Sequence, residues 1–263
     1  VHGTAVCAIG LRVDDAANAM ARAKAFQAQT FFQPVGPGEL ELPAIRGVGG
    51  SLIYFMDRKS DLARVWDIEF EAQADASAVG GAGLSTVDHI AQSMPYEEML
   101  RWLLFYRSIL DVEKLAPVDV VDPGGLVRSQ VLQSLTARFL ADYMDAGVQH
   151  IAFATDDIFA ASSALRANGM TMLRIPDNYY DDLDARFDLP ADLLDRLRAG
   201  QILYDRDADG EYFQIYTGNI AGWLFFEVVQ RRDYSGFGAS NAPIRLAAQT
   251  RAAPRRDMPR VRR

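Results

Sequence analysis

The sequence has little cysteine and no long apolar stretch. Its 263 residues contain one cysteine, Cys7, so a disulfide within the chain is excluded; a single thiol is typical of a reducing compartment, and we expect a cytoplasmic protein. No apolar run approaches the ~20 residues that a membrane-spanning helix needs. No basic segment followed by an apolar core opens the sequence either. We therefore expect neither a signal peptide nor contact with a membrane.

Basic charge is also scarce in most of the chain. The net charge is −8, although the last thirteen residues, RAAPRRDMPRVRR, hold six arginines and one aspartate, so the part before them is more acidic still. An acidic surface repels nucleic acid, and we expect no nucleic-acid partner. The arginine-rich end carries prolines and no apolar period, which predicts a disordered tail without a function of its own.

Three passages of the sequence are alike. Each opens with an apolar, strand-like run and continues into a segment with the apolar spacing and capping residues of a helix. The three runs are AVCAIGLRV at 5–13, TVDHIAQS at 86–93 and VQHIAFAT at 148–155. Short strand candidates follow each helix, among them TMLRIP, QILYD, YFQIYT and WLFFEVVQ in the last passage. This repeat predicts an α+β fold of βαβββ units, with half-barrel sheets and the helices outside.

The repeat is uneven. In the middle passage GLVRSQVLQS runs into TARFLADYM with no room for another strand, so we expect the middle unit to be a strand short. The chain also enters its first strand almost at once, which suggests that it is a piece of something longer. In the last unit, NYYDDLDARFDLPADLLDRLRAG at 178–200 predicts a loop followed by an acidic amphipathic helix over the sheet.

Two motifs have simple explanations. GVGGS at 47–51 is glycine-rich but lacks the Lys-Ser/Thr of a phosphate-binding loop and leads into a strand, which favours a hairpin turn. DRDADG at 205–210 resembles the start of a calcium loop, but Tyr216 stands where the loop needs a glutamate. A tight turn between two strands is the better interpretation.

The histidines are few and two of them are placed alike. Of the three, His89 and His150 occupy the same position in matching strands, as DHIA and QHIA, whereas His2 lies at the chain terminus and is no candidate ligand. A single histidine in an apolar strand is most often a core residue. Two at equivalent positions of repeated units can converge on one point if the sheets face inward.

Glu227 is the most conspicuous carboxylate in an apolar strand, WLFFEVVQ. An unpaired buried carboxylate costs several kcal/mol, so we expect Glu227 to be exposed, paired or bound to a metal. Two histidines and one carboxylate are the ligand set of non-haem Fe(II) oxygenases, with Mn or Zn as the next candidates. No catalytic nucleophile is evident, because Cys7 has no histidine in its local pattern and no serine stands in an elbow of glycines.

The chain resembles the vicinal oxygen chelate superfamily and, within it, the 4-hydroxyphenylpyruvate dioxygenase family. The matching segments are spread over residues 87–242: VDHIA, LLFYRSIL, AGVQHIAFATDD, PDNYYDDL, ILYDRDADGEYFQIYT, FFEVVQR and GFGASN. The resemblance implies that His89, His150 and Glu227 hold Fe(II), or another divalent metal such as Mn, Mg, Co or Zn. It also implies that Gln214 and Phe237 face an aromatic substrate, a 2-oxo acid that reacts with dioxygen by decarboxylation and ring hydroxylation.

The sequence departs from this family at two places. A pocket-lining strand with a Leu-Asn-Glu-Pro-like segment is expected between Ser134 and Thr136 and is missing. Where the family has a phenylalanine after Gly-Asn, this chain has Ala242 and Pro243. The departures concern the substrate pocket and leave the metal ligands in place.

A closer resemblance is to the dioxygenase-like C-terminal half of bacterial two-domain 3-dehydroshikimate dehydratases. It rests on four sequence segments: ELPAIRGVGGSLIYFMD, HIAQSMPYEEMLRWLLFYRSIL, NYYDDLDARFDL and NAPIRLAAQTR. The resemblance implies an N-terminal TIM-barrel domain, fused or associated, that carries the dehydratase site and forms protocatechuate. We then expect residues 1–84 to be a truncated first unit without metal, 85–242 to be the metal-binding half, and 243–263 to be a C-terminal segment.

Three hypotheses of function follow. The first is a 4-hydroxyphenylpyruvate dioxygenase-like oxidoreductase, and the second is a part of a 3-dehydroshikimate dehydratase in quinate and shikimate catabolism. The third is a metal-binding but catalytically silent domain that stabilises or regulates a partner. In the first two the ligand is a small aromatic or alicyclic acid. Exposed sheet edges left by missing strands would also favour pairing in a homo-oligomer.

Overall fold

The computed structural model describes residues 4–71, 80–114, 119–122, 125–128, 146–220 and 223–252. Within these residues the chain forms two compact units. Unit 1 comprises the described residues of Val1–Val79, Gln92–Ala116 and Phe139–Val148, and unit 2 comprises those of Gly80–Ala91, Pro117–Arg138 and Gln149–Arg263. The chain passes from one unit to the other several times, so neither unit is a continuous segment.

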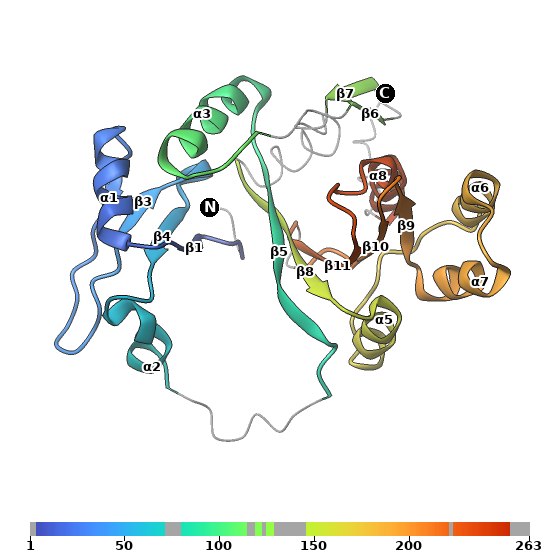
Figure 1. Ribbon diagram of the computed structural model, residues 1–263, viewed down its shortest axis with the longest axis horizontal. Helices are drawn as coiled ribbons and strands as arrows, with labels where there is room; N and C mark the ends of the chain where they lie inside the picture. The colour runs from blue at the N-terminus through green and yellow to red at the C-terminus, as the bar shows by residue number, and fades with distance from the viewer. Residues whose placement is uncertain are drawn as a thin grey trace, which may run out of the picture. The chain divides into compact units, whose positions relative to one another are not determined.

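Unit 1 contains a strand, a helix and three strands in chain order (Figure 1). These elements are β1 (Ala8–Arg12), α1 (Ala16–Ala25), β2 (Thr30–Phe31), β3 (Ala44–Arg46) and β4 (Leu52–Met56). The strand order is β1-β4-β3-β2, with β1 and β4 parallel and the other neighbours antiparallel. Helix α1 begins where the Asp15 carboxylate accepts the backbone N–H of Asn18 at 2.8 Å. The βαβββ order expected for the first passage is thus present.

Helix α3 (Met99–Ile109) packs on the core of unit 1. Phe105, Tyr106 and Ile109 of this helix join an apolar cluster around the fully buried Phe55 of β4. The Tyr106 hydroxyl donates a hydrogen bond to Gln92 Oε1 at 2.7 Å. A short helix, α2 (Val65–Glu69), follows β4 in the same unit.

Unit 2 is built on a five-stranded sheet of order β5-β8-β11-β10-β9. The strands are β5 (Leu84–Ser93), β8 (Gly147–Thr155), β9 (Leu203–Arg206), β10 (Glu211–Tyr216) and β11 (Phe225–Arg232). Strands β8 and β11 pair in parallel, whereas β11, β10 and β9 form an antiparallel meander. Together with helix α5 (Ile158–Ala167), β8 and the last three strands repeat the βαβββ order of unit 1.

Three helices gather beside β9, β10 and β11 in Figure 1. They are α5, α6 (Asn178–Phe187) and α7 (Ala191–Gly200). Apolar side chains of α5, α6 and α7 form one buried cluster with strand residues such as Phe213, Ile215 and Val228. This cluster is the main core of unit 2, and α5, α6 and α7 cover the face of the sheet that bears Phe213, Ile215 and Val228.

Segment 178–200 differs from the sequence-based expectation. The sequence predicts a loop and one helix there, but the structure has two helices, α6 and α7. Tyr179, Tyr180 and Leu183 lie on one buried face of α6, which gives its acidic sequence an anchor in the core. Asp188 adopts a left-handed conformation and Pro190 precedes α7, so the break between the helices is local.

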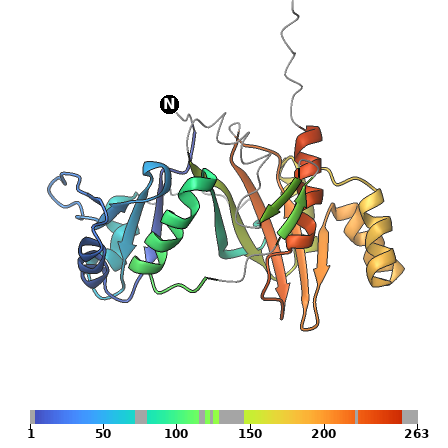
Figure 2. The same cartoon turned by 90° about the horizontal axis from the view of Figure 1, so that it is seen from above.

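Two further strands, β6 (Asp119–Asp122) and β7 (Gly125–Arg128), form a separate antiparallel hairpin. Figure 2 shows this hairpin beside α8 (Ala242–Ala252), the last described helix. Residues 129–145 lie outside the described residues, as do those beyond 252. The strand expected to be missing between Ser134 and Thr136 and the disordered arginine-rich tail therefore stay predictions.

The two turn interpretations are confirmed. Residues Val48–Gly50 form a short 3-10 turn that joins the antiparallel strands β3 and β4. Between β9 and β10, the Asp207 carboxylate accepts the backbone N–H groups of Asp209 at 2.9 Å and Gly210 at 2.8 Å. These hydrogen bonds close the tight turn that the DRDADG motif predicts.

The α+β class is confirmed, with mixed sheets and helices packed on them. The strand expected in TMLRIP is reduced to a single bridge between Met172 and Thr217. The division into 1–84, 85–242 and 243–263 stays a prediction. Among the described residues, no helix is both long and apolar enough to cross a membrane.

The backbone of the GVGGS turn predicts different effects on stability for substitutions of its two glycines Gly49 and Gly50. Gly49 has φ +62°, and a Cβ there would overlap the carbonyl oxygen of Ala146, whereas Gly50 has φ +74° and open space around it. We expect Gly49→Ala to lower the free energy of unfolding by about 3 kcal/mol or more, from backbone strain plus steric overlap. Gly50→Ala should cost only the strain, about 1–2 kcal/mol. Urea unfolding of both variants checks this, and equal losses would contradict the close approach of Gly49 to Ala146.

The hydrogen bonds of the Asp57 carboxylate predict how the stability of unit 1 depends on pH. Its carboxylate accepts hydrogen bonds from the backbone of Ala16 at 2.9 Å, the hydroxyl of Ser60 at 2.8 Å and the backbone of Ser60 and Lys59. These bonds, that from Ala16 foremost, lower the pKa of Asp57 to about 2. Because the folded pKa lies below the unfolded value of about 3.9, the stabilisation is present above that value and is lost as the pH falls toward 2.

We therefore expect Asp57→Asn to have a lower urea midpoint than the wild type at pH 7, by an amount that stays constant down to about pH 5 and shrinks toward pH 2. The exposed Asp61 provides a matched control, and Asp61→Asn should follow the wild type across the range. A wild-type advantage over Asp57→Asn that grows with acidification would contradict the assignment.

Candidate metal centre

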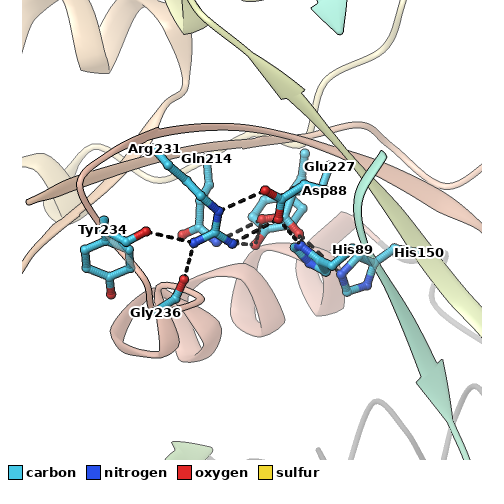
Figure 3. Close-up of polar contacts among 9 residues, drawn as sticks. Asp88, His89, His150, Gln214, Glu227, Arg231, Tyr234 and Gly236 are labelled. Atoms are coloured by element: carbon cyan, nitrogen blue, oxygen red, sulfur yellow. Dashed lines mark hydrogen bonds and ion pairs between the residues drawn. The ribbon is translucent and has the colours of Figure 1, made fainter. Parts of the chain in front are cut away.

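Three side chains from neighbouring strands converge on one face of the sheet in unit 2. His89 lies on β5, His150 on β8 and Glu227 on β11, and these strands are adjacent in the sheet. One potential ligand atom from each lies within 4.8 Å of the others, and Figure 3 shows the three side chains meeting. Glu227 is 2% exposed and His150 8%, so the group is largely shielded from solvent.

Strand register explains why two of these side chains share a face. In the parallel pair, Phe225 lies opposite His150 and Glu227 lies opposite Ala152. Residues two apart in a strand point to the same side, so His150 and Glu227 project from the same face. The Phe225 ring stacks on the His150 imidazole, with centroids 4.9 Å apart.

The distances suit a metal ion. Glu227 Oε2 lies 3.4 Å from His89 Nε2 and 3.3 Å from His150 Nε2. Ligand atoms that bind one cation at about 2.1 Å are separated by about 3.0 Å in octahedral and about 3.4 Å in tetrahedral geometry. The donor set of two imidazoles and a carboxylate matches Fe(II), Mn, Co or Zn. The residues present therefore fit a divalent cation.

Charge is distributed unevenly among the three groups. Burial alone would raise the pKa of Glu227, but the facing His150 and His89 outweigh burial and hold that pKa below its usual range. Burial lowers the pKa of the His150 imidazole, and the positive charge of Arg245 adds to this effect. For His89, the carboxylates of Glu227 and Asp88 outweigh burial and raise its pKa. The site thus holds an ionised carboxylate beside a neutral His150.

The second oxygen of Glu227 is held by polar side chains of β10. Gln214 Nε2 donates to Glu227 Oε1 at 2.9 Å, and the Tyr216 hydroxyl donates to the same oxygen at 3.1 Å. Asn241 Nδ2 in turn donates to Gln214 Oε1 at 2.9 Å, which fixes the orientation of the Gln214 amide. The carboxylate therefore turns Oε2 toward the histidines and keeps Oε1 for hydrogen bonds.

His89 is held in place by a pair of charged residues. Its Nδ1 lies 2.7 Å from Asp88 Oδ1, so the Nδ1–H donates to the carboxylate and Nε2 faces Glu227. Arg231 holds Asp88 through two hydrogen bonds of 2.9 Å, from Nε and Nη2. The guanidinium also donates to the backbone carbonyls of Tyr234 and Gly236, as Figure 3 shows. The turn after β11 is thus tied to the orientation of His89.

The two predicted substrate contacts lie in different surroundings. Phe237 is 51% exposed, and its ring lies edge-to-face with His89 at 5.4 Å between centroids. Gln214 is buried, and its amide already bonds to Glu227, Tyr216 and Asn241. Both lie beside the three candidate ligands, and a contact of either with a substrate stays a prediction.

Sequence reasoning missed the supporting residues Asp88, Arg231, Tyr216 and Asn241. Two of them had a local signal, since Asp88 precedes His89 directly and Tyr216 stands two positions after Gln214, on the same face of β10. Arg231 and Asn241 had no local sequence signal. Arg231 contacts Asp88 across 143 positions of the chain, and Asn241 contacts Gln214 across 27 positions.

Comparison with protein families matches two parts of the chain. Residues 1–71 match the model described as hydroxyphenylpyruvate dioxygenase, HPPD, N-terminal. Residues 86–215 match the glyoxalase/bleomycin resistance protein/dioxygenase superfamily. The second match contains His89, His150 and Gln214, and the α+β fold is consistent with the vicinal oxygen chelate fold.

Two groups of proteins stand among those similar to this chain. The chain is 41% identical to a 3-dehydroshikimate dehydratase of Pseudomonas aeruginosa, over 99% of its own length and 44% of that protein. A solved structure described as a xylose isomerase-like TIM barrel/4-hydroxyphenylpyruvate dioxygenase fusion protein is 39% identical, with a TM-score of 0.79 over 96% of this chain and 42% of that one. The chain thus spans less than half the length of these two proteins.

The chain covers a larger share of the relatives in the second group. A 4-hydroxyphenylpyruvate dioxygenase of Pseudomonas aeruginosa is 33% identical over 91% of this chain and 72% of the relative. On the strength of this match and of the two family models, the chain belongs to the 4-hydroxyphenylpyruvate dioxygenase family within the glyoxalase and dioxygenase superfamily.

Proposed function

We propose that His89, His150 and Glu227 hold Fe(II) and that the chain is a 4-hydroxyphenylpyruvate dioxygenase-like oxidoreductase acting on a 2-oxo acid with dioxygen. The observation that carries the proposal is the position of Glu227 Oε2, which faces Nε2 of both histidines at 3.3 and 3.4 Å. A bound Fe(II) would supply Lewis-acid and redox chemistry toward an oxo acid and dioxygen. Membership of the family supports the same assignment.

The chain's own residues prepare the site for this chemistry. Glu227 supplies a negative charge that is already ionised, and Gln214 and Tyr216 hold its other oxygen away from the cation. Asp88 keeps the Nδ1–H of His89 engaged, so Nε2 is presented as a ligand. Phe237 offers an exposed aromatic face beside His89, where an aromatic ring could stack.

A second candidate function follows from the lengths of the relatives. The chain matches a 3-dehydroshikimate dehydratase over nearly its whole length while covering 44% of that protein, and it matches a TIM-barrel fusion in the same proportion. The chain would then be the dioxygenase-like part of such a dehydratase, with a TIM-barrel domain as its fused or associated partner. We place either enzyme in the cytoplasm, which the unpaired Cys7 supports.

Metal binding is the first test of the proposed site. We expect the protein to bind one equivalent of Fe(II) under anaerobic conditions, and His150→Ala and Glu227→Ala to weaken binding more than about a hundredfold, because each removes a ligand from a buried site. Isothermal titration calorimetry measures the affinity. His2→Ala, which changes the third histidine of the chain, is the control. Unchanged affinity in the His150 and Glu227 variants would exclude the site.

Turnover separates the candidate functions on the same metal-loaded protein. Oxygen uptake with 4-hydroxyphenylpyruvate and formation of homogentisate are expected for the dioxygenase. Conversion of 3-dehydroshikimate to protocatechuate by this chain alone would favour the dehydratase instead. One equivalent of bound metal without either reaction would exclude the dioxygenase and leave two hypotheses: the catalytically silent domain, and the part of a dehydratase whose reaction is carried by the TIM-barrel domain.

The hydrogen bond from the Tyr216 hydroxyl to Glu227 predicts an effect on stability. Tyr216→Phe removes one hydroxyl from a fully buried carboxylate and leaves the ring in place. We expect the free energy of unfolding of the metal-free protein to fall by about 1–3 kcal/mol, because the lost donor served a charged acceptor. Chemical denaturation measures it. Tyr54→Phe in unit 1, whose ring is only partly buried, is the control and should change little; equal effects of the two substitutions would contradict the role of the Tyr216 hydroxyl.

A further inference from the structure

Arg231 makes four hydrogen bonds beside the candidate metal centre (Figure 3). Its Nε and Nη2 donate to the two oxygens of the Asp88 carboxylate, both at 2.9 Å. Its Nη1 donates to the backbone carbonyls of Tyr234 and Gly236. A guanidinium carries five N–H donors in one rigid plane, so a single side chain can hold a carboxylate and two carbonyls at once. Arg231 is therefore a link between two segments of unit 2.

The first segment is strand β5, which Arg231 reaches through Asp88. Asp88 Oδ1 lies 2.7 Å from His89 Nδ1, which directs Nε2 of that imidazole toward Glu227. In the described sheet order β5 is the outermost strand, so His89 has neighbouring strand residues on one side only. Nδ1 of His150 has no hydrogen-bond partner among the described residues, and its ring stacks on Phe225 instead. Of the two histidines, His89 is thus the one that a charged pair supports.

The second segment is the turn after β11, which carries Phe237. The turn begins at Asp233, whose φ of 55° is a left-handed conformation that is unfavourable for most residues other than glycine. Contacts from outside the turn therefore help to hold its shape, and Arg231 supplies two of them through the backbone carbonyls. The Phe237 ring lies 5.1 Å from the Arg231 guanidinium carbon and edge-to-face with His89 at 5.4 Å between centroids. Arg231 thus contacts both the ring and the turn that carries it.

We propose that Arg231 is a positioning residue that couples the binding of a cation to the order of the turn at residues 233–238. The inference rests on the proposed metal site, because His89 is its first link. When Nε2 of His89 binds a cation, the imidazole is fixed and holds the Asp88 carboxylate through its Nδ1–H. That carboxylate holds the fork of Arg231, and Arg231 holds the carbonyls of the turn. The aromatic face of Phe237 is therefore fixed beside the site when the cation is bound, and is held less firmly without it.

Three substitutions isolate this link. Arg231→Met keeps the length of the side chain and removes all four hydrogen bonds, and Asp88→Asn keeps the shape of the carboxylate and removes its charge. Arg232→Met is the matched control, because Arg232 is the next residue of the strand, its side chain is 52% exposed, and it pairs with Glu211 instead. An exposed ion pair contributes little to stability, so the control removes an arginine without touching the link.

The affinity for Co(II) measures the part of the link that reaches His89. By isothermal titration calorimetry, we expect Arg231→Met and Asp88→Asn each to bind Co(II) about 10- to 100-fold more weakly than the wild type, because each removes the support of a metal-binding histidine. The double variant should lie within about threefold of the weaker single variant, because both residues act through His89. The visible absorption of bound Co(II), which depends on ligand geometry, should change in Arg231→Met and stay unchanged in Arg232→Met.

Amide hydrogen exchange measures the part of the link that reaches the turn. In the wild type and in Arg232→Met, saturating Co(II) should slow the exchange of residues 233–238 about fivefold or more, the low end of couplings between two sites. In Arg231→Met, exchange in the turn should be the same with and without saturating Co(II). A variant that had merely lost stability would instead exchange faster throughout unit 2.

Three results would overturn the inference and leave the metal site standing. They are a Co(II) affinity and spectrum of Arg231→Met that match those of Arg232→Met, losses of affinity that multiply in the double variant, and a slowing of the turn by Co(II) that persists in Arg231→Met. If Arg231→Met does not fold, Arg231→Lys takes its place with intermediate effects, because an ammonium keeps the charge but has three donors for four acceptors. A wild-type protein that binds no Co(II) would overturn the metal site, and this inference with it.

Discussion

A buried, ionised carboxylate is the constraint on which the rest of unit 2 depends. Glu227 is almost inaccessible to solvent, and an isolated charge in such a place would cost several kcal/mol. Its oxygen Oε2 therefore faces the two imidazoles, and its oxygen Oε1 accepts hydrogen bonds from Gln214 and Tyr216. These four groups need their own partners, which extends the network to Asn241 and, through His89, to Asp88. The polar layer of the sheet follows from satisfying one charge.

The residues at the centre of this network were predictable, because their signals are local. His89 and His150 stand out as matching positions of a repeat, and Glu227 as a carboxylate in an apolar strand. The α+β class and the βαβββ order follow from the same periodicity. Contacts that join distant parts of the chain, such as Arg231 with Asp88 or Arg245 with Phe225, leave no pattern in a single sequence. Helix α6, at the start of segment 178–200, was predicted as a loop because its acidic composition outweighs the signal of its buried Tyr179 and Tyr180.

The repeat of the sequence and the packing of the structure do not divide the chain in the same way. The middle passage contributes most of β5 to the sheet of unit 2, whereas the helix after it, α3, packs on Phe55 in unit 1. A strand can join a sheet wherever an edge offers unpaired backbone N–H and C=O groups. An amphipathic helix can bury its apolar face against any apolar surface of suitable width. One repeat can therefore serve two cores, and its fragments are not independent folding units.

The placement of the three candidate ligands on adjacent strands has a consequence for how this site can diverge. The spacing and register of the three strands fix the positions of the three candidate ligand atoms. Spacing and register vary little in a sheet, so the ligand triangle is held rigidly. Phe237 lies instead on the exposed turn after β11, and surface turns tolerate substitution and displacement more easily. Selection can thus alter the side chains that surround the three candidate ligands without disturbing the ligand triangle itself.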